Sequence, residues 1–184
     1  MTYRYIPAPA TVGTYKIEGG AWQEGLLYVG VPGQLSVLSQ DKKDTVTYQA
    51  KQVKAYVTGQ DTFEVLRNLK VKKGNLEAVF AHRLYKYGQL TAFKVPRRLI
   101  LFGEPSVNGI PASVFELVVQ STTGDAVVVP IGRRAFIEAM LPLVGDCPEL
   151  ATQISKGKLW REDMRKILRT YAYWQQANPQ SAVN

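Results

Sequence analysis

Residues 113–145, SVFELVVQSTTGDAVVVPIGRRAFIEAMLPLVG, contain the change of pattern that decides the fold. The runs SVFELVVQ and DAVVVPI are rich in β-branched residues and flank the turn residues 121–124, which predicts a β-hairpin. The next twelve residues, RRAFIEAMLPLV (133–144), have a helical composition, and Gly145 suits the end of that helix. The chain is therefore expected to form strands before residue 131 and helices after residue 133.

The upstream part of the chain consists of short apolar runs separated by turn residues. GLLYVGV and QLSVLS are divided by Pro32-Gly33, and the polar stretch QDKKD (40–44) leads into TVTYQA. In VKAYVT (53–58), Val53, Ala55 and Val57 alternate with Lys54 and Tyr56. LKVK (69–72) alternates in the same way. A period of two is typical of a sheet with one buried face.

The downstream part predicts two more helices. In DCPEL, Asp146 and Glu149 have the spacing of a capping box, and Pro148 lies in the first turn, so a short helix should run to about Ser155, with Gly157 ending it. A last helix is expected at 162–175. It places an apolar stripe on one face, made of Met164, Ile167, Leu168, Tyr171 and Trp174.

These patterns predict an α+β fold, a mainly antiparallel β-sheet (roll, sandwich or partial barrel) with a C-terminal cap of about three helices. Residues 1–13 are expected to be an extended N-terminal segment. Residues 14–176 are expected to form a single domain, with a β core at 14–131 and the helical cap at 133–176. The tail, 177–184, should fray.

The composition is that of a globular protein, because 46% of the 184 residues are hydrophobic and 21% are charged. No apolar run approaches the 18 or so residues needed to cross a bilayer. The first residues, MTYRYIPAPATVG, lack the apolar region of a secretory signal. Two interpretations stay open: a cytoplasmic protein, or a mature protein whose signal has been removed.

The net charge of +8 is concentrated in one segment. Residues 1–66 carry 6 Lys and Arg and 6 Asp and Glu, and residues 99–184 carry 8 of each kind. Residues 67–98 carry nine basic residues against one acid, Glu77. The charge therefore indicates a local positive field rather than general basicity.

Aromatic rings accompany these charges in HRLYKYGQLTAFKVPRR (82–98), which we interpret as a β-strand pair with a positive exposed face. Rings and cations on one face suit stacking on bases or sugars, with the cations binding phosphates or sulfates. The candidate binding residues are Lys70, Lys72, Lys73, Arg83, Tyr85, Lys86, Tyr87, Lys94, Arg97 and Arg98. Two other interpretations stay open: a solvated sheet face, and a surface for a protein partner.

The residues available for catalysis are few. His82 is the one histidine, and Cys147, the one cysteine, lies in a helix-start signature, where a half-buried thiol is the favoured interpretation. A structural zinc site needs about four Cys or His ligands and is excluded by count. The common phosphate, dinucleotide, hydrolase and zinc-protease motifs do not occur. The sequence therefore predicts no catalytic residue, metal or cofactor, although a pair of carboxylates could still meet in space.

Three stretches resemble a family of β-rich secreted or envelope proteins with no known activity that is common in Bacteroidota. They are TYQAKQVKAYVTGQDTFEVLRNLKV (47–71), FAHRLYKYGQLTAF (80–93) and LVGDCPELATQI with DMRKILRTYAYW (143–174). The matching positions are Val53, Tyr56, Phe63, Phe80, Leu84, Gly88, Asp146, Pro148, Leu150 and Tyr171. The resemblance implies a periplasmic or envelope location and supplies no site residue.

The resemblance and the shortage of catalytic groups lead to three hypotheses. The first is a non-enzymatic secreted or periplasmic module that binds a protein or an envelope component. The second is a binder of an anionic polymer, nucleic acid or acidic glycan, through residues 67–98. The third is an enzyme that uses carboxylate chemistry.

Overall fold

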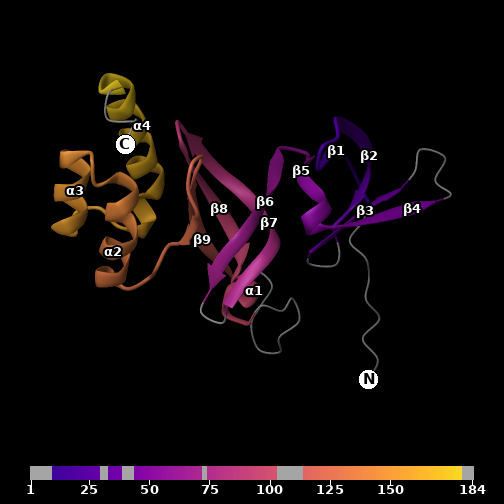
Figure 1. The fold of residues 1–184 in the computed structure, drawn as a ribbon, viewed down its shortest axis with the longest axis horizontal. Coiled ribbons are helices and arrows are strands. Elements are labelled where there is room, and N and C mark those ends of the chain that lie inside the picture. The colour runs from indigo at the N-terminus through magenta and orange to yellow at the C-terminus, as the bar shows by residue number, and fades with distance from the viewer. Residues whose placement is uncertain (1–9, 30–32, 39–43, 72–73, 103–113, 180–184) are drawn as a thin grey trace. The chain divides into compact units, whose positions relative to one another are not determined.

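The computed structural model describes residues 10–29, 33–38, 44–71, 74–102 and 114–179, without the side chains of Arg98 and Phe102. Ten strands and four helices follow one another along this part of the chain (Figure 1). The strands are β1 (Thr11–Ile17), β2 (Trp22–Tyr28), β3 (Gln34–Leu38), β4 (Thr45–Gln49), β5 (Val53–Thr58), β6 (Asp61–Val71), β7 (Gly74–Tyr87), β8 (Leu90–Pro96), β9 (Phe115–Ser121) and β10 (Ala126–Val128). The helices are α1 (Arg97–Phe102), α2 (Arg133–Val144), α3 (Pro148–Ser155) and α4 (Met164–Ala177), with short 3₁₀ turns at Ala50–Gln52 and Arg161–Asp163.

The strands form one open antiparallel sheet in the order β10-β9-β8-β7-β6-β5-β1-β2-β3-β4. The predicted α+β class with a mainly antiparallel sheet and C-terminal helices is therefore confirmed. The sequence left a roll, a sandwich or a partial barrel open as arrangements. The described sheet is open, because its two edge strands, β10 and β4, do not pair with each other. None of the described helices is long and apolar enough to cross a membrane.

By the contacts among its residues, the chain divides into two compact units. Unit 1 comprises Met1–His82 and Val95–Val114, and unit 2 comprises Arg83–Lys94 and Phe115–Asn184. Unit 2 thus joins strands to the helices that the sequence assigned to the C-terminal cap. The expectation of a single domain over 14–176 stays a prediction.

One cluster of buried residues in unit 1, which we call the strand core, lies among its strands. Its buried residues come from four strands of the sheet, β1, β2, β3 and β5, and are Tyr15, Leu27, Leu35, Val37, Val53 and Tyr56. The expectation that Tyr56 shares the outer face of β5 with Lys54 is wrong, because Tyr56 is buried and stacks on Phe63 at 4.6 Å between ring centroids. The reason is a β-bulge. The register of β1 against β5 shifts after Lys16, so one extra β5 residue, Lys54, is accommodated and Val53 returns to the core face.

Unit 2 has a larger core, which we call the helical core. Strands β8 and β9, the segment after β10 and the C-terminal helices supply its buried residues, which are Leu90, Ala92, Val119, Val129, Phe136, Met140, Val144, Cys147, Leu150, Ile154, Leu159, Met164, Ile167, Leu168 and Tyr171. The predicted stripe of α4 faces this core, with Trp174 partly buried at its edge. The hairpin predicted at 121–124 is also observed, with β9 and β10 paired antiparallel.

The helix ends agree with the sequence except at three places. The predicted cap Asp146 is wrong, because Cys147 occupies the N-cap of α3 and Asp146 instead accepts a hydrogen bond from the Tyr171 hydroxyl at 3.0 Å. The last helix runs from Met164 to Ala177 after a 3₁₀ turn, rather than over 162–175. Arg97 begins α1, a helix that the sequence did not predict, rather than ending a strand. Residues 1–9 of the predicted N-terminal segment lie outside the described residues, and β1 begins at Thr11, three residues before the predicted domain start.

Candidate functional site

The end of β7 and the second half of β8 hold five of the ten predicted binding residues, all within unit 2. Arg83, Tyr85 and Tyr87 alternate along β7 and therefore share one face of the strand. Lys86 and Lys94 are exposed, whereas Arg83 is half-buried. We call Arg83, Tyr85, Lys86, Tyr87 and Lys94 the basic hairpin.

A tight turn positions the basic hairpin against α4. Gly88 has φ +53°, a left-handed conformation that favours glycine. A Cβ atom at this position would lie 3.3 Å from the Cβ of Ala172, so the turn also requires a close approach to the helix. The backbone N–H of Thr122 donates to the carbonyl of Gln89 at 2.9 Å and ties the turn to the end of β9.

The two rings of the basic hairpin are already engaged by an arginine of α4. The Arg165 guanidinium lies over the Tyr85 ring at 5.7 Å, and Arg165 Nε donates to the Tyr87 hydroxyl at 3.2 Å. This hydrogen bond raises the pKa of Arg165. Both rings also pack against the helical core. Stacking of a base or sugar on Tyr85 would compete with the guanidinium, whereas the exposed lysines remain accessible to an anion.

Sequence reasoning missed Arg165, although a weak signal was present. Arg165 and Arg169 are four residues apart and both are exposed on α4, opposite the buried stripe. The sequence places these charged residues on the face opposite the apolar stripe. What it did not reveal was that the hairpin turn packs onto α4, which brings Arg165 to the tyrosines.

The other predicted binding residues lie in unit 1 or outside the described residues. Lys70 is exposed on β6, and Arg97 is half-buried at the start of α1. Lys72 and Lys73 lie outside the described residues, as does the side chain of Arg98. The structure therefore brings together the basic hairpin but does not describe the ten predicted residues as one site. Their role in binding stays a prediction.

The two residues considered for catalysis have structural partners. Cys147 is buried in the helical core. His82 Nε2 lies 3.0 Å from Asp61 Oδ1, and its ring stacks on Phe63 at 5.0 Å between centroids. Among the residues the structure describes, no three His, Cys, Asp or Glu side chains form a group that could hold a metal ion.

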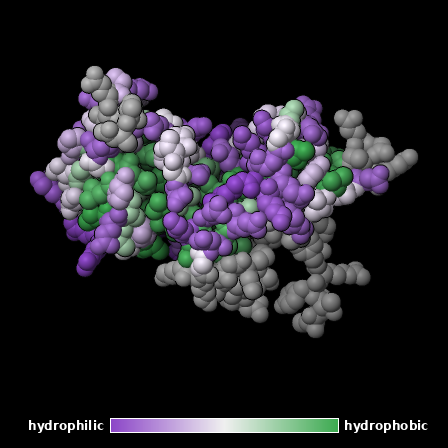
Figure 2. Space-filling view, in the orientation of Figure 1, coloured by the Kyte–Doolittle hydropathy of each residue, from purple (hydrophilic) through white to green (hydrophobic). Residues whose placement is uncertain are grey.

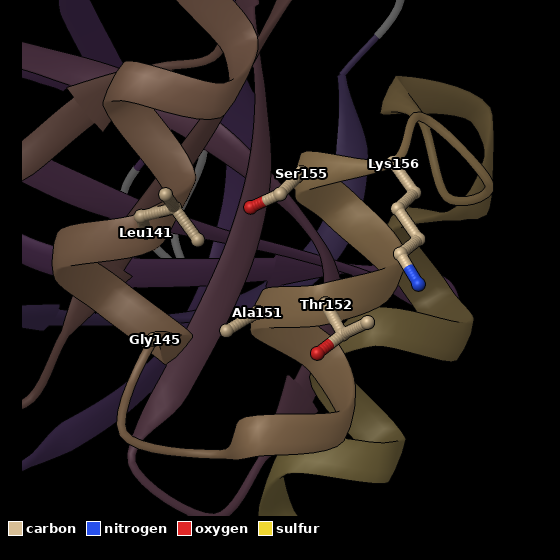
Figure 3. A pocket seen from close by; sticks show the side chains of 6 residues that line it. All are labelled: Leu141, Gly145, Ala151, Thr152, Ser155 and Lys156. Carbon is tan, nitrogen blue, oxygen red and sulfur yellow. The ribbon is translucent and has the colours of Figure 1, made fainter.

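Each unit has a hollow that is lined by described residues. The hollow in unit 2 has a volume of about 600 Å³ and lies between α2 and α3, where Ser155 and Leu141 face each other (Figure 3). Its lining is Leu141, Gly145, Ala151, Thr152, Ser155 and Lys156. The hollow in unit 1 has one carboxylate, Glu77, in its lining. Neither of these hollows holds the pair of carboxylates that glycoside hydrolysis uses.

A second candidate surface is an apolar row on unit 1. The register pairs Val12 of β1 with Leu26 of β2, and Leu26 with Leu38 of β3. Directly paired residues lie on the same face, so these three side chains form a continuous row across three strands, on the face opposite Tyr15 and the strand core. Val12 is 73% exposed, and Leu26 and Leu38 are half-buried. We call Val12, Leu26 and Leu38 the apolar row.

An exposed tryptophan extends this face. Along β1 and β2, the pair Val12 and Leu26 is followed by the pair Thr14 and Glu24 and then by Lys16 and Trp22. Trp22 is 50% exposed. In the view of Figure 2, hydrophobic residues reach the surface among strands β1–β4, whereas the surface over β6 and β7 is mainly hydrophilic. Sequence reasoning missed this surface because the register that aligns its residues was not predictable from the chain.

Comparison of the chain with models of protein families, with curated proteins and with solved structures found no match in any of the three.

Proposed function

We propose that the protein is a non-enzymatic binding module whose partner is another protein or a component of the cell envelope. The observation that carries this proposal is the apolar row with Trp22 beside it. Apolar side chains that continue across three strands, one exposed and two half-buried, with charged residues at their border, resemble the apolar centre and polar rim of protein interfaces. An exposed tryptophan is among the residues that contribute most to such interfaces.

We further propose that the protein is secreted or periplasmic, with a cytoplasmic location as the alternative. The support for this is the resemblance to the Bacteroidota envelope family at positions such as Val53, Gly88 and Asp146. Fractionation of the native cells, with the intact mass of the untagged protein measured in each fraction, tests it. A processed mass in the periplasm or membrane fraction is expected. A cytoplasmic protein that begins at Met1 would overturn it.

Site-specific photo-cross-linking in those cells tests the binding surface. A photoreactive residue at position 12 should yield a discrete cross-linked band, because Val12 lies in the apolar row. The matched control is position 173, since Tyr173 is also apolar and 64% exposed but belongs to α4 in unit 2. Leu38→Glu should remove the band from position 12. Equal bands from both positions, or turnover of any substrate that one side-chain change abolishes, would contradict the proposal.

A second candidate function, the binding of an anionic polymer, rests on the exposed lysines of the basic hairpin. Binding through several such cations must weaken steeply with salt. Lys86→Glu with Lys94→Glu should then weaken binding of a heparin or single-stranded DNA probe about tenfold or more at low salt. Lys156→Glu with Lys158→Glu is the matched control, because both lysines are exposed in unit 2 away from the hairpin. Affinity that does not change with salt would exclude this function.

A further inference from the structure

The two edges of the sheet differ in how they are protected. Edge strands expose unpaired N–H and C=O groups, and natural proteins usually protect them with lysine, proline, bulges or very short strands. At one edge, β10 has three residues, Ala126–Val128, and Pro130 follows two residues later. At the other edge, β4 has the sequence TVTYQ, without a charged residue or a proline. No described strand pairs with its outer side.

The hydrogen-bond pattern shows which β4 residues face outward. The N–H of Ala50 donates to the carbonyl of Gly33 at 2.8 Å, and the register pairs Gln49 with Gln34. Hydrogen-bonded pairs alternate in an antiparallel ladder, so Val46 and Tyr48 bond to β3. The backbone groups of Thr45, Thr47 and Gln49 consequently point away from the sheet. One of these groups, the Gln49 N–H, is already satisfied by Gln52 Oε1 at 2.8 Å.

The exposure of the β4 side chains also indicates that a further strand could pack on the outer side of β4. Val46 and Tyr48 pair with Val37 and Leu35, and therefore lie on the face of the strand core. Leu35 and Val37 are buried, but Val46 is 48% exposed. The apolar face of the sheet thus continues to its last strand, where one further strand would cover it.

We propose that β4 pairs with β4 of a second copy of the chain, antiparallel and centred on Thr47. This register places Thr47 opposite Thr47 of the second copy. The outward N–H of each Thr47 then donates to the outward carbonyl of the other, which gives the two hydrogen bonds of a bonded pair. Val46 then lies opposite Tyr48 of the second copy in a non-bonded pair, where side chains are closest and an aromatic residue stabilises a β-branched one.

The charges of the chain are compatible with a second copy as the occupant. No charged residue lies within Thr45–Gln49, so no like charges oppose each other within the paired strands. Residues 1–66 carry equal numbers of acids and bases, whereas the net positive charge of the chain comes from 67–98. The apolar row adjoins β4, because Leu38 pairs with Thr45, but it lies on the face opposite Val46 and Tyr48, and neither feature requires the other to function.

Cysteine cross-linking of the full chain tests the register. Thr47→Cys should form an intermolecular disulfide under mild oxidation, because the two Cα atoms of a bonded pair lie about 5.5 Å apart, within the range of a disulfide. The matched control is Thr45→Cys on the same exposed strand. In the proposed register the two copies of residue 45 lie about 14 Å apart, at about 3.4 Å a residue, and cannot be bridged. A mixture of Thr45→Cys and Gln49→Cys should cross-link. The native Cys147 is buried and should not interfere.

Sedimentation equilibrium tests the association without a covalent bond. The unaltered chain should show a mass that rises from monomer to dimer with concentration. Thr47→Lys and Thr47→Glu should each be monomeric, since like charges then lie opposite each other, and an equimolar mixture of the two should dimerise. Circular dichroism checks that both variants fold. A monomer at every concentration, a dimer that persists in Thr47→Lys, or equal cross-linking from Thr45→Cys would overturn the proposal.

Discussion

The two units differ in the elements that cover the apolar face of the sheet. In unit 2 the helices cover the sheet, and the helical core gathers fifteen buried residues. In unit 1 the strand core gathers six, all from strands, other buried residues such as Leu66 and Leu69 lie outside it, and Val46 on the core face remains 48% exposed. The difference suggests a division of roles, because a well-covered core contributes stability whereas incompletely covered apolar strands are available for partners. Four paired substitutions test this comparison.

Truncation of a buried leucine should show the largest difference. Leu90 and Leu35 are both buried strand residues, one in the helical core and one in the strand core beside the edge strand. The cost of Leu→Ala depends on how far the surroundings collapse into the cavity. We expect Leu90→Ala to lower the free energy of unfolding by about 4 kcal/mol and Leu35→Ala by about 2–3 kcal/mol. Urea denaturation measures both, and equal costs would contradict the comparison.

The ion pairs of the two units provide the second test. In unit 2, Arg161 Nη2 lies 3.0 Å from Glu116 Oε2, and these side chains are 20% and 10% exposed. In unit 1, Arg67 and Glu18 are 41% and 49% exposed. Glu116→Gln should cost about 3 kcal/mol, because it leaves a largely buried guanidinium without its counter-charge. Glu18→Gln should cost below about 0.5 kcal/mol, since solvent screens that pair.

A double substitution controls for the loss of packing at the buried pair. Arg161 Nε has no hydrogen-bond partner among the described residues, which adds to the cost of keeping this side chain buried. Glu116→Gln combined with Arg161→Met should therefore be less destabilising than the sum of the two single changes. Strict additivity would show that the two charges are independent.

Two glycines in left-handed turns give a third, smaller difference. Gly88 in unit 2 and Gly59 in unit 1 have φ +53° and +59°. Alanine is strained at both positions, which costs about 1 kcal/mol. A Cβ at Gly88 also meets Ala172, whereas a Cβ at Gly59 has no atom within 4 Å. We expect Gly88→Ala to cost about 2 kcal/mol in all and Gly59→Ala about 1 kcal/mol, measured by thermal unfolding.

The sequence predicted the regular elements of unit 2 well and the tertiary contacts poorly. The boundaries of α2, the start of α3 at Pro148 and the stripe of α4 follow from local periodicity and from proline and glycine positions. Asp146 shows the limit. Its spacing from Glu149 fits a helix cap, but Tyr171, 25 residues later, provides its hydrogen-bond partner. A local pattern cannot reveal a partner so distant in the chain.

The candidate surfaces were predictable to different degrees for the same reason. The charge of 67–98 is a property of composition, so the basic hairpin could be proposed from the sequence. The contact of Arg165 with its tyrosines, and the row formed by Val12, Leu26 and Leu38, depend on packing and register. Register is set by the pairing of whole strands and by bulges such as the one at Lys54, and a shift of one residue would turn every side chain to the other face.

The last comparison is between the effects of two buried tyrosines, one from each core, on stability at alkaline pH. Burial raises the pKa of Tyr56 in the strand core. Burial, and then the hydrogen bond to Asp146, raise the pKa of Tyr171 in the helical core. Below the ordinary tyrosine pKa of about 10, both states of the chain keep these protons and stability is unaffected. Above it, the unfolded chain releases protons that the folded chain retains, so stability should fall by up to about 1.4 kcal/mol per pH unit for each tyrosine.

Phenylalanine substitutions separate the two causes. At pH 7, Tyr171→Phe should cost about 1 kcal/mol, because it removes a hydrogen bond to Asp146, whereas Tyr56→Phe should cost less. Between pH 10 and 11, each variant should lose less stability than the unaltered chain, since one proton-retaining group is gone. Urea midpoints at pH 7, 10 and 11 measure both effects. A pH dependence unchanged in Tyr171→Phe would mean that Asp146 and the helical core do not hold this proton, and that the two cores respond alike to alkali.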